Sequence, residues 1–288
     1  MHRLLALLLL AGLATAAENQ ESTPAASESP APSTSPSPAA PAANPNNPQI
    51  PAAIQDYMDK NFQTDKDGQC NGLSAPAFQG SGDKIPFCMQ LHSLKKTDQG
   101  SYALFVGNSS EKGHGNPGLV RLVAFDRNDQ PGTSGDVYVG SWGEAPTDWR
   151  WTELGPGLWG VVDESGYSQM GETYITTQLI FDMHGQVQSA SIPSRFSNRD
   201  KYGDCSAAKD AKAAEVSPEQ CAKELADLSA ELKVKTDLPQ DFTLYPVAML
   251  VSGSRGTGSR EEKFDKQEFI FHFDGKGYQP PADYPIKW

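Results

Sequence analysis

Short apolar runs recur in pairs along this chain, with turn-forming segments rich in Gly, Asp and Asn between the two members of a pair. Apolar and polar residues that alternate between such turns predict antiparallel hairpins. We expect four hairpins, formed by residues 87–92 with 101–106, 119–125 with 137–142, 173–181 with 186–192, and 243–251 with 268–273. A chain patterned in this way should fold mainly into antiparallel sheet.

Two segments carry helix signals instead. Pro51 suits a first helical turn, and Ile54, Tyr57 and Met58 then share one apolar face. The second predicted helix covers residues 217–235, where Ser217 is a predicted N-cap residue and Gln220 completes a capping box. The apolar stripe of this second helix would consist of Cys221, Leu225, Leu228 and Leu232. The expected fold class is therefore α+β, made of antiparallel hairpins with two helices, and a β-sandwich with a helical insertion is the alternative.

The four cysteines predict two disulfides. An even count in an exported chain indicates two disulfides with three possible connectivities, and the two local pairs favour Cys70–Cys88 and Cys205–Cys221. A zinc site made of all four thiolates is the alternative, but the sequence has no C-x2-C pair.

The N-terminal region reads as a leader followed by a spacer. Residues 1–17 combine Arg3, a short apolar run and a small-residue cleavage pattern, which predicts a signal peptide for export to the periplasm or the medium. Residues 18–50 are rich in Pro, Ala and Ser and contain no aromatic residue, so we expect a disordered spacer, with an O-glycosylated stalk as the alternative. Residues 51–288 should form one α+β domain. Its apolar runs are too short for membrane insertion, which predicts a soluble exported protein.

Charge limits the partners. The chain has 24 Lys and Arg residues against 36 Asp and Glu residues, a net charge of −12. This balance argues against binding to nucleic acid or to anionic membranes, both of which need clustered basic residues. The sequence also lacks the G-x-S-x-G, H-E-x-x-H and P-loop motifs. We therefore expect no cofactor, no metal and no assignable catalytic residue.

Residues 142–172 are the most unusual segment, because they hold four of the five tryptophans and six acidic residues with a single Arg. Aromatic rings beside carboxylates are typical of sugar-binding surfaces. The candidate ligand-binding surface consists of Trp142, Trp149, Trp151, Trp159, Glu144 and Asp148. The alternative is that these tryptophans are buried in the core.

Three functional hypotheses follow. The leading one is an exported non-catalytic binding or envelope-associated module for an unidentified protein or glycan. The second is a carbohydrate-binding or carbohydrate-active protein that uses residues 142–172. The third is an acidic, inhibitor-type partner of a basic protein.

Overall fold

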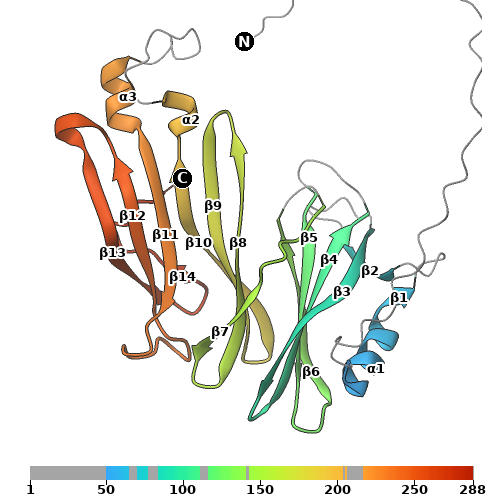
Figure 1. The fold of residues 1–288 in the computed structure, drawn as a ribbon. Coiled ribbons are helices and arrows are strands. Elements are labelled where there is room, and N and C mark those ends of the chain that lie inside the picture. The colour runs from blue at the N-terminus through green and yellow to red at the C-terminus, as the bar shows by residue number, and fades with distance from the viewer. Residues whose placement is uncertain are drawn as a thin grey trace, which may run out of the picture. The chain divides into compact units, whose positions relative to one another are not determined.

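Antiparallel strands make up most of the fold, as the hairpin pattern predicts (Figure 1). The computed structural model describes residues 50–64, 70–76, 84–110, 116–140, 143–203, 205 and 217–287. The first sheet has the order β1-β2-β3-β4-β5-β6. Its strands are β1 (Gln63–Thr64), β2 (Asn71–Pro76), β3 (Lys84–Thr97), β4 (Gly100–Ser109), β5 (Gly118–Phe125) and β6 (Pro131–Val139).

The second sheet has the order β14-β13-β12-β11-β10-β9-β8-β7 and is also antiparallel throughout. Its strands are β7 (Arg150–Gly155), β8 (Leu158–Gln169), β9 (Glu172–Met183), β10 (Gln186–Ser197), β11 (Ala226–Val234), β12 (Val247–Arg255), β13 (Glu262–Phe273) and β14 (Tyr278–Gln279). The four predicted hairpins correspond to the pairs β3–β4, β5–β6, β9–β10 and β12–β13.

The first predicted helix is present as α1 (Ala52–Asn61), which begins directly after Pro51. Its face of Ile54, Tyr57 and Met58 is buried against the first sheet. The Tyr57 ring stacks on Phe105, with 5.8 Å between the ring centroids. The apolar periodicity at this end of the domain therefore predicted both the helix and the face that it buries.

The second helix is much shorter than predicted, and the prediction for residues 217–235 is wrong beyond Glu224. The N-cap is correct, since Ser217 Oγ accepts a hydrogen bond from the Gln220 backbone, but α3 covers only Pro218–Glu224. Residues 226–234 form β11, which pairs along its whole length with β12. Leucines at 225, 228 and 232 fit a helical period, but the alternation from Ala226 to Val234 fits a strand equally well, and pairing with β12 decides between them.

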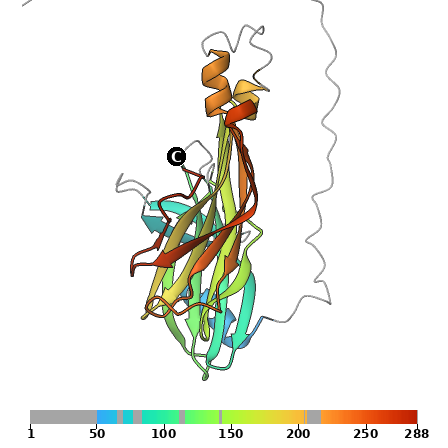
Figure 2. The same cartoon turned by 90° about the vertical axis from the view of Figure 1, so that its left-hand side faces the viewer.

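Disulfides join Cys70 to Cys88 and Cys205 to Cys221. The second bond ties the residues after α2 (Arg199–Tyr202) to α3, and these two helices lie at one end of the second sheet (Figure 2). Tyr202 and Leu225 pack beside it in a small separate cluster. A single 3-10 turn, η1 (Gly258–Arg260), connects β12 to β13.

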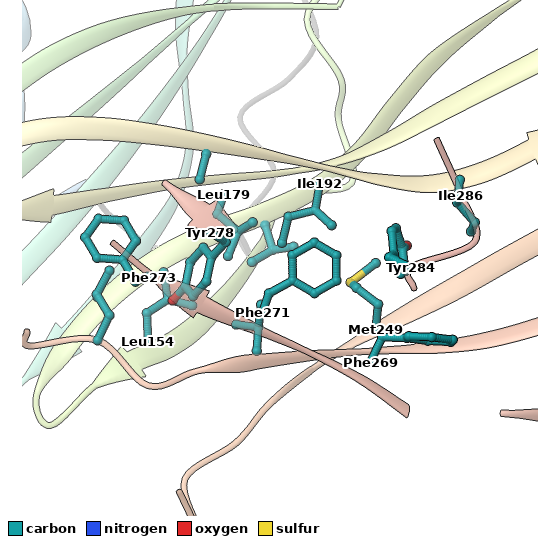
Figure 3. Close-up of a cluster of buried hydrophobic side chains, with 14 of the residues drawn as sticks. Leu154, Leu179, Ile192, Met249, Phe269, Phe271, Phe273, Tyr278, Tyr284 and Ile286 are labelled. Carbon is teal, nitrogen blue, oxygen red and sulfur yellow. The ribbon is translucent and has the colours of Figure 1, made fainter. Parts of the chain in front are cut away.

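The largest core lies on one face of the second sheet and draws on strands β7 to β14 (Figure 3). The C-terminal residues Tyr284 and Ile286 close this core, and the Tyr284 ring packs edge-on against Phe271 at 4.8 Å between centroids. Tyr284 Oη donates a hydrogen bond to the Pro193 carbonyl of β10. The C-terminal segment is thus held to the sheet by both packing and a hydrogen bond.

A third buried cluster joins the two sheets. Leu104, Val120 and Leu122 of the first sheet meet Val161 and Ile180 of the second in this cluster. Within the described residues, no helix is both long and apolar enough to cross a bilayer.

Candidate functional site

The candidate site is a groove of about 810 Å³ beside Arg150, the first residue of β7, where β8 extends past β7 and keeps β9 as its partner on one side only. β7 pairs with β8 only as far as Val162, whereas β9 pairs with the other side of β8 from Gly160 to Gln169. The lining comes from the segment before β7, from β8 after Val162, from the start of β9 and from the middle of β11. We call this feature the acidic groove, after its charged residues Asp148, Asp163, Glu164, Glu231 and Arg150.

Negative charge dominates the acidic groove, since four carboxylates face one guanidinium. In the described part of the chain, none of these five side chains takes part in an ion pair. Asp148, Arg150, Glu164 and Glu231 are exposed, so water solvates them in the free protein. The groove therefore presents several carboxylate oxygen atoms that form no ion pair with the described residues.

Asp163 differs from the other three acids because it is buried, with only 5% of its surface exposed. It follows Val161 on the face of β8 that packs between the sheets, and its Oδ2 atom has no hydrogen-bond partner in the part of the chain that the structure describes. Burial raises the pKa of this carboxyl, and the charges of Asp148 and Glu164 raise it further. A hydrogen bond from the Glu164 backbone and the charge of Arg150 offset part of that effect.

A second buried polar atom without a partner among the described residues lies on the neighbouring strand β9. Thr177 stands opposite Glu164 in the β8–β9 pairing, and its buried Oγ1 atom has no hydrogen-bond partner among the described residues. A buried polar atom without a partner costs about 1–3 kcal/mol, so natural proteins keep few of them. Thr177 shares its face of the sheet with Glu164, whereas Asp163 points to the other face, so the two unpaired atoms lie on opposite sides of the sheet.

The tryptophans that the sequence pointed to lie elsewhere, and none of the described ones lines the acidic groove. Trp149 is buried between the sheets, and its Nε1 atom donates to the Pro146 carbonyl. Trp151 donates to Ser93 Oγ of β3, while the Lys95 ammonium sits 3.4 Å from the centre of the Trp159 ring. These placements favour the interpretation of the three rings as packing residues that hold the start of the second sheet against β3.

The remaining predicted site residues do not all lie at the acidic groove. Trp142 lies outside the described residues, and Glu144 is exposed but does not line the acidic groove. Asp148 does line it. Of the candidate surface named from the sequence, Asp148 alone among the described residues belongs to the groove.

Sequence reasoning missed the residues that give the groove its character. Asp163 and Glu164 lie inside the segment singled out for its acids, but the sequence offered no reason to choose them over their neighbours. The available signal was an acidic residue directly after the buried run Val161–Val162 in a strand. Glu231 was missed because residues 217–235 were assigned to a helix, which places this residue on the wrong element.

The groove offers acceptors rather than metal-binding geometry. Within the described residues, no group of three or more His, Cys, Asp or Glu side chains is arranged to hold a metal ion. No protein-family model, curated protein or solved structure matches this chain.

Proposed function

We propose that this chain is an exported, non-catalytic binding protein whose acidic groove receives a cationic group of its partner. The single observation that carries the proposal is that Asp163 lines the groove with a buried Oδ2 atom that has no hydrogen-bond partner among the described residues. Lys and Arg side chains carry donors that suit such an acceptor, and charge-assisted hydrogen bonds are among the strongest in proteins.

The surroundings of Asp163 support a cationic ligand over an anionic one. Asp148, Glu164 and Glu231 add three further negative charges around the same groove, and only Arg150 opposes them. A bound ammonium or guanidinium would lower the repulsion between these carboxylates and would satisfy the buried oxygen atom. An anion would be repelled by these carboxylates, and it would bring no donor for the buried oxygen atom of Asp163.

Export is part of the proposal and rests on two observations. The structure forms two disulfides, which are typical of oxidising compartments, and the first 17 residues have the pattern of a signal peptide. The partner would then be another exported or envelope component that presents basic residues.

The test is binding of a capped oligolysine peptide, measured by calorimetry at about 0.05 M and about 1 M salt. We expect binding at low salt that is lost at high salt, and a weaker affinity in the Glu164→Gln, Glu231→Gln double variant. The matched control is the Asp265→Asn, Asp283→Asn double variant, which removes the same charge at exposed positions outside the groove. Equal weakening in both double variants would mean that net charge, and not the groove, attracts the peptide.

A glycan ligand is the second candidate function, and one observation favours it. The Tyr167 ring lines the groove with 58% of its surface exposed and stacks on Tyr174 at 5.3 Å between centroids. A sugar ring could stack on the open face of Tyr167 while its hydroxyls bond to the nearby carboxylates. Binding of uncharged oligosaccharides that is insensitive to salt and lost in Tyr167→Ala would favour this function over the first.

A further inference from the structure

We propose that the groove binds an extended basic peptide segment, which adds as a new strand to the open edge of β8 between Asp163 and Gln169. This inference rests on the proposed function and specifies its ligand. In such strand addition, main-chain hydrogen bonds supply affinity and side-chain contacts supply specificity.

The edge of β8 is open after Val162 because β7, its neighbour on that side, does not extend beyond this point. β7 leaves β8 after Val162, while the β8–β9 pairing continues to Gln169. Among the described residues, no strand pairs with the other side of β8 from Asp163 onward. Seven residues of strand extend over about 23 Å, which is long enough to pair with a strand of ordinary length.

The geometry of this edge is regular. The β8–β9 register runs from Gly160 to Gln169 without a shift, so the backbone groups along the open side keep an even spacing. The open segment has the sequence DESGYSQ and therefore contains no Pro, Lys or Arg. Natural proteins prevent pairing at an edge with Pro and with charged side chains, Lys above all, and the only charged residues here are Asp163 and Glu164 at the start of the segment.

The outer edge of β13, in the same sheet, is protected against pairing with another strand. β14 pairs only with His272 and Phe273, which leaves most of β13 on the outside of the sheet. There the register shifts near Gly253, Lys266 has a positive φ of 50°, and Lys263 is exposed. A bulge and lysines blunt an edge in this way. Since the protein blunts one edge of the sheet and keeps the β8 edge regular, the β8 edge is suited to receive a strand.

The negative charge of the acidic groove determines which kind of strand can bind there. Asp163 and Glu164 begin the open edge, and Asp148 and Glu231 line the same groove, so an incoming strand should carry Lys or Arg. The chain's own residues 18–50 contain three Glu and no Lys or Arg, which makes them a poor match. A second copy of the chain would bring its own DESGYSQ segment to the edge, and that segment contains no Lys or Arg to pair with the carboxylates.

The test uses a capped peptide of alternating lysine and valine and two derivatives of it, one N-methylated at every lysine and the other at every valine. In a strand, successive residues direct their N–H groups to opposite edges, so each derivative removes the donors from one edge and keeps the charge. Binding to the full folded protein is measured at low salt for the parent and for both derivatives. The Glu164→Gln variant and the Asp265→Asn control are measured with the parent.

We expect one derivative to bind at least about tenfold more weakly than the parent while the other binds nearly as well, because only one edge of the peptide faces β8. If both derivatives bind like the parent peptide, or if both lose binding equally, strand addition is wrong. The proposed function would still hold in that case, provided that binding of the parent peptide is weakened by salt. If the parent itself does not bind, both the strand addition and the proposed function are wrong. Dimerisation of the free protein that Glu164→Gln strengthens would identify the open edge as a contact between copies and would also overturn the inference.

Discussion

Replacing Asp163 with asparagine should stabilise the free protein while weakening its binding. The Asp163 side chain is buried, and no described residue forms a hydrogen bond with its Oδ2 atom, so the folded state carries a desolvation cost that the unfolded chain does not. Asparagine has nearly the same shape and carries no charge. The substitution therefore removes the cost of burying a charge and leaves the packing between the sheets intact.

The size of the gain follows from the cost of an unsatisfied buried polar group, which is about 1–3 kcal/mol. The lower end applies here, because the groove opens to solvent and the amide of asparagine still needs a partner. We expect a gain of about 1 kcal/mol in the free energy of unfolding at neutral pH. For a domain of this size that gain raises the Tm by about 2–4 °C.

The gain should depend on pH in a defined direction. The pKa of Asp163 is raised in the folded state, whereas an aspartate in the unfolded chain titrates near about 3.9. Between these two values the folded state binds more protons than the unfolded state, so the wild-type protein loses stability as the pH rises through that window. Below about pH 3.9 the carboxyl is protonated in both states, and the advantage of Asp163→Asn should vanish.

The assay is urea unfolding followed by circular dichroism, at neutral pH and at acid pH, for the wild-type protein and Asp163→Asn. Asp148→Asn serves as the control, since it removes the same charge from an exposed position in the groove and should change stability by no more than about 0.5 kcal/mol. An Asp163→Asn protein that is less stable than the wild type at neutral pH would refute the reasoning. It would mean that the carboxylate is satisfied in the folded state.

Three further substitutions test the packing of the second sheet. Replacing Cys205 and Cys221 together with alanine should cost about 3 kcal/mol, since their disulfide spans a separation of 16 residues, and an unchanged urea midpoint would contradict this. Gly253→Ala should destabilise the protein by more than about 2 kcal/mol, because its Cβ would lie 2.0 Å from a carbonyl oxygen of β11, whereas the control Gly258→Ala meets nothing within 4 Å and should cost only about 1 kcal/mol. Similar losses of Tm in the two glycine variants would speak against the close contact. Tyr284→Phe should cost about 1–2 kcal/mol by leaving a carbonyl of β10 without its donor, and wild-type stability in this variant would show that the hydrogen bond contributes nothing.

Local patterns predicted the parts of this fold that depend on local chemistry. The hairpins follow from alternation and turn residues, and α1 follows from the face formed by Ile54, Tyr57 and Met58. Residues 226–234 were assigned to a helix because their leucines fit both periods, and only pairing with β12 selects the strand. The sequence does not contain that information in any local window.

The groove was harder to predict because it depends on where two strands stop pairing. Nothing between Trp149 and Asp163 in the sequence shows that β7 leaves β8 at Val162, or that Glu231 of β11 lines the same groove. The tryptophans attracted attention because rings and acids often meet at binding surfaces. The described tryptophans instead pack against the first sheet, and the unsatisfied acid lies further along β8.

Amide hydrogen exchange is the most direct test of the central claim that the groove receives a basic strand at the open edge of β8. The measurement compares exchange with and without the alternating lysine–valine peptide at low salt. We predict slower exchange at alternate residues between Asp163 and Gln169, with little change along the blunted edge of β13. Unchanged exchange in β8 at a peptide concentration that saturates binding, or equal protection of β13, would contradict the claim.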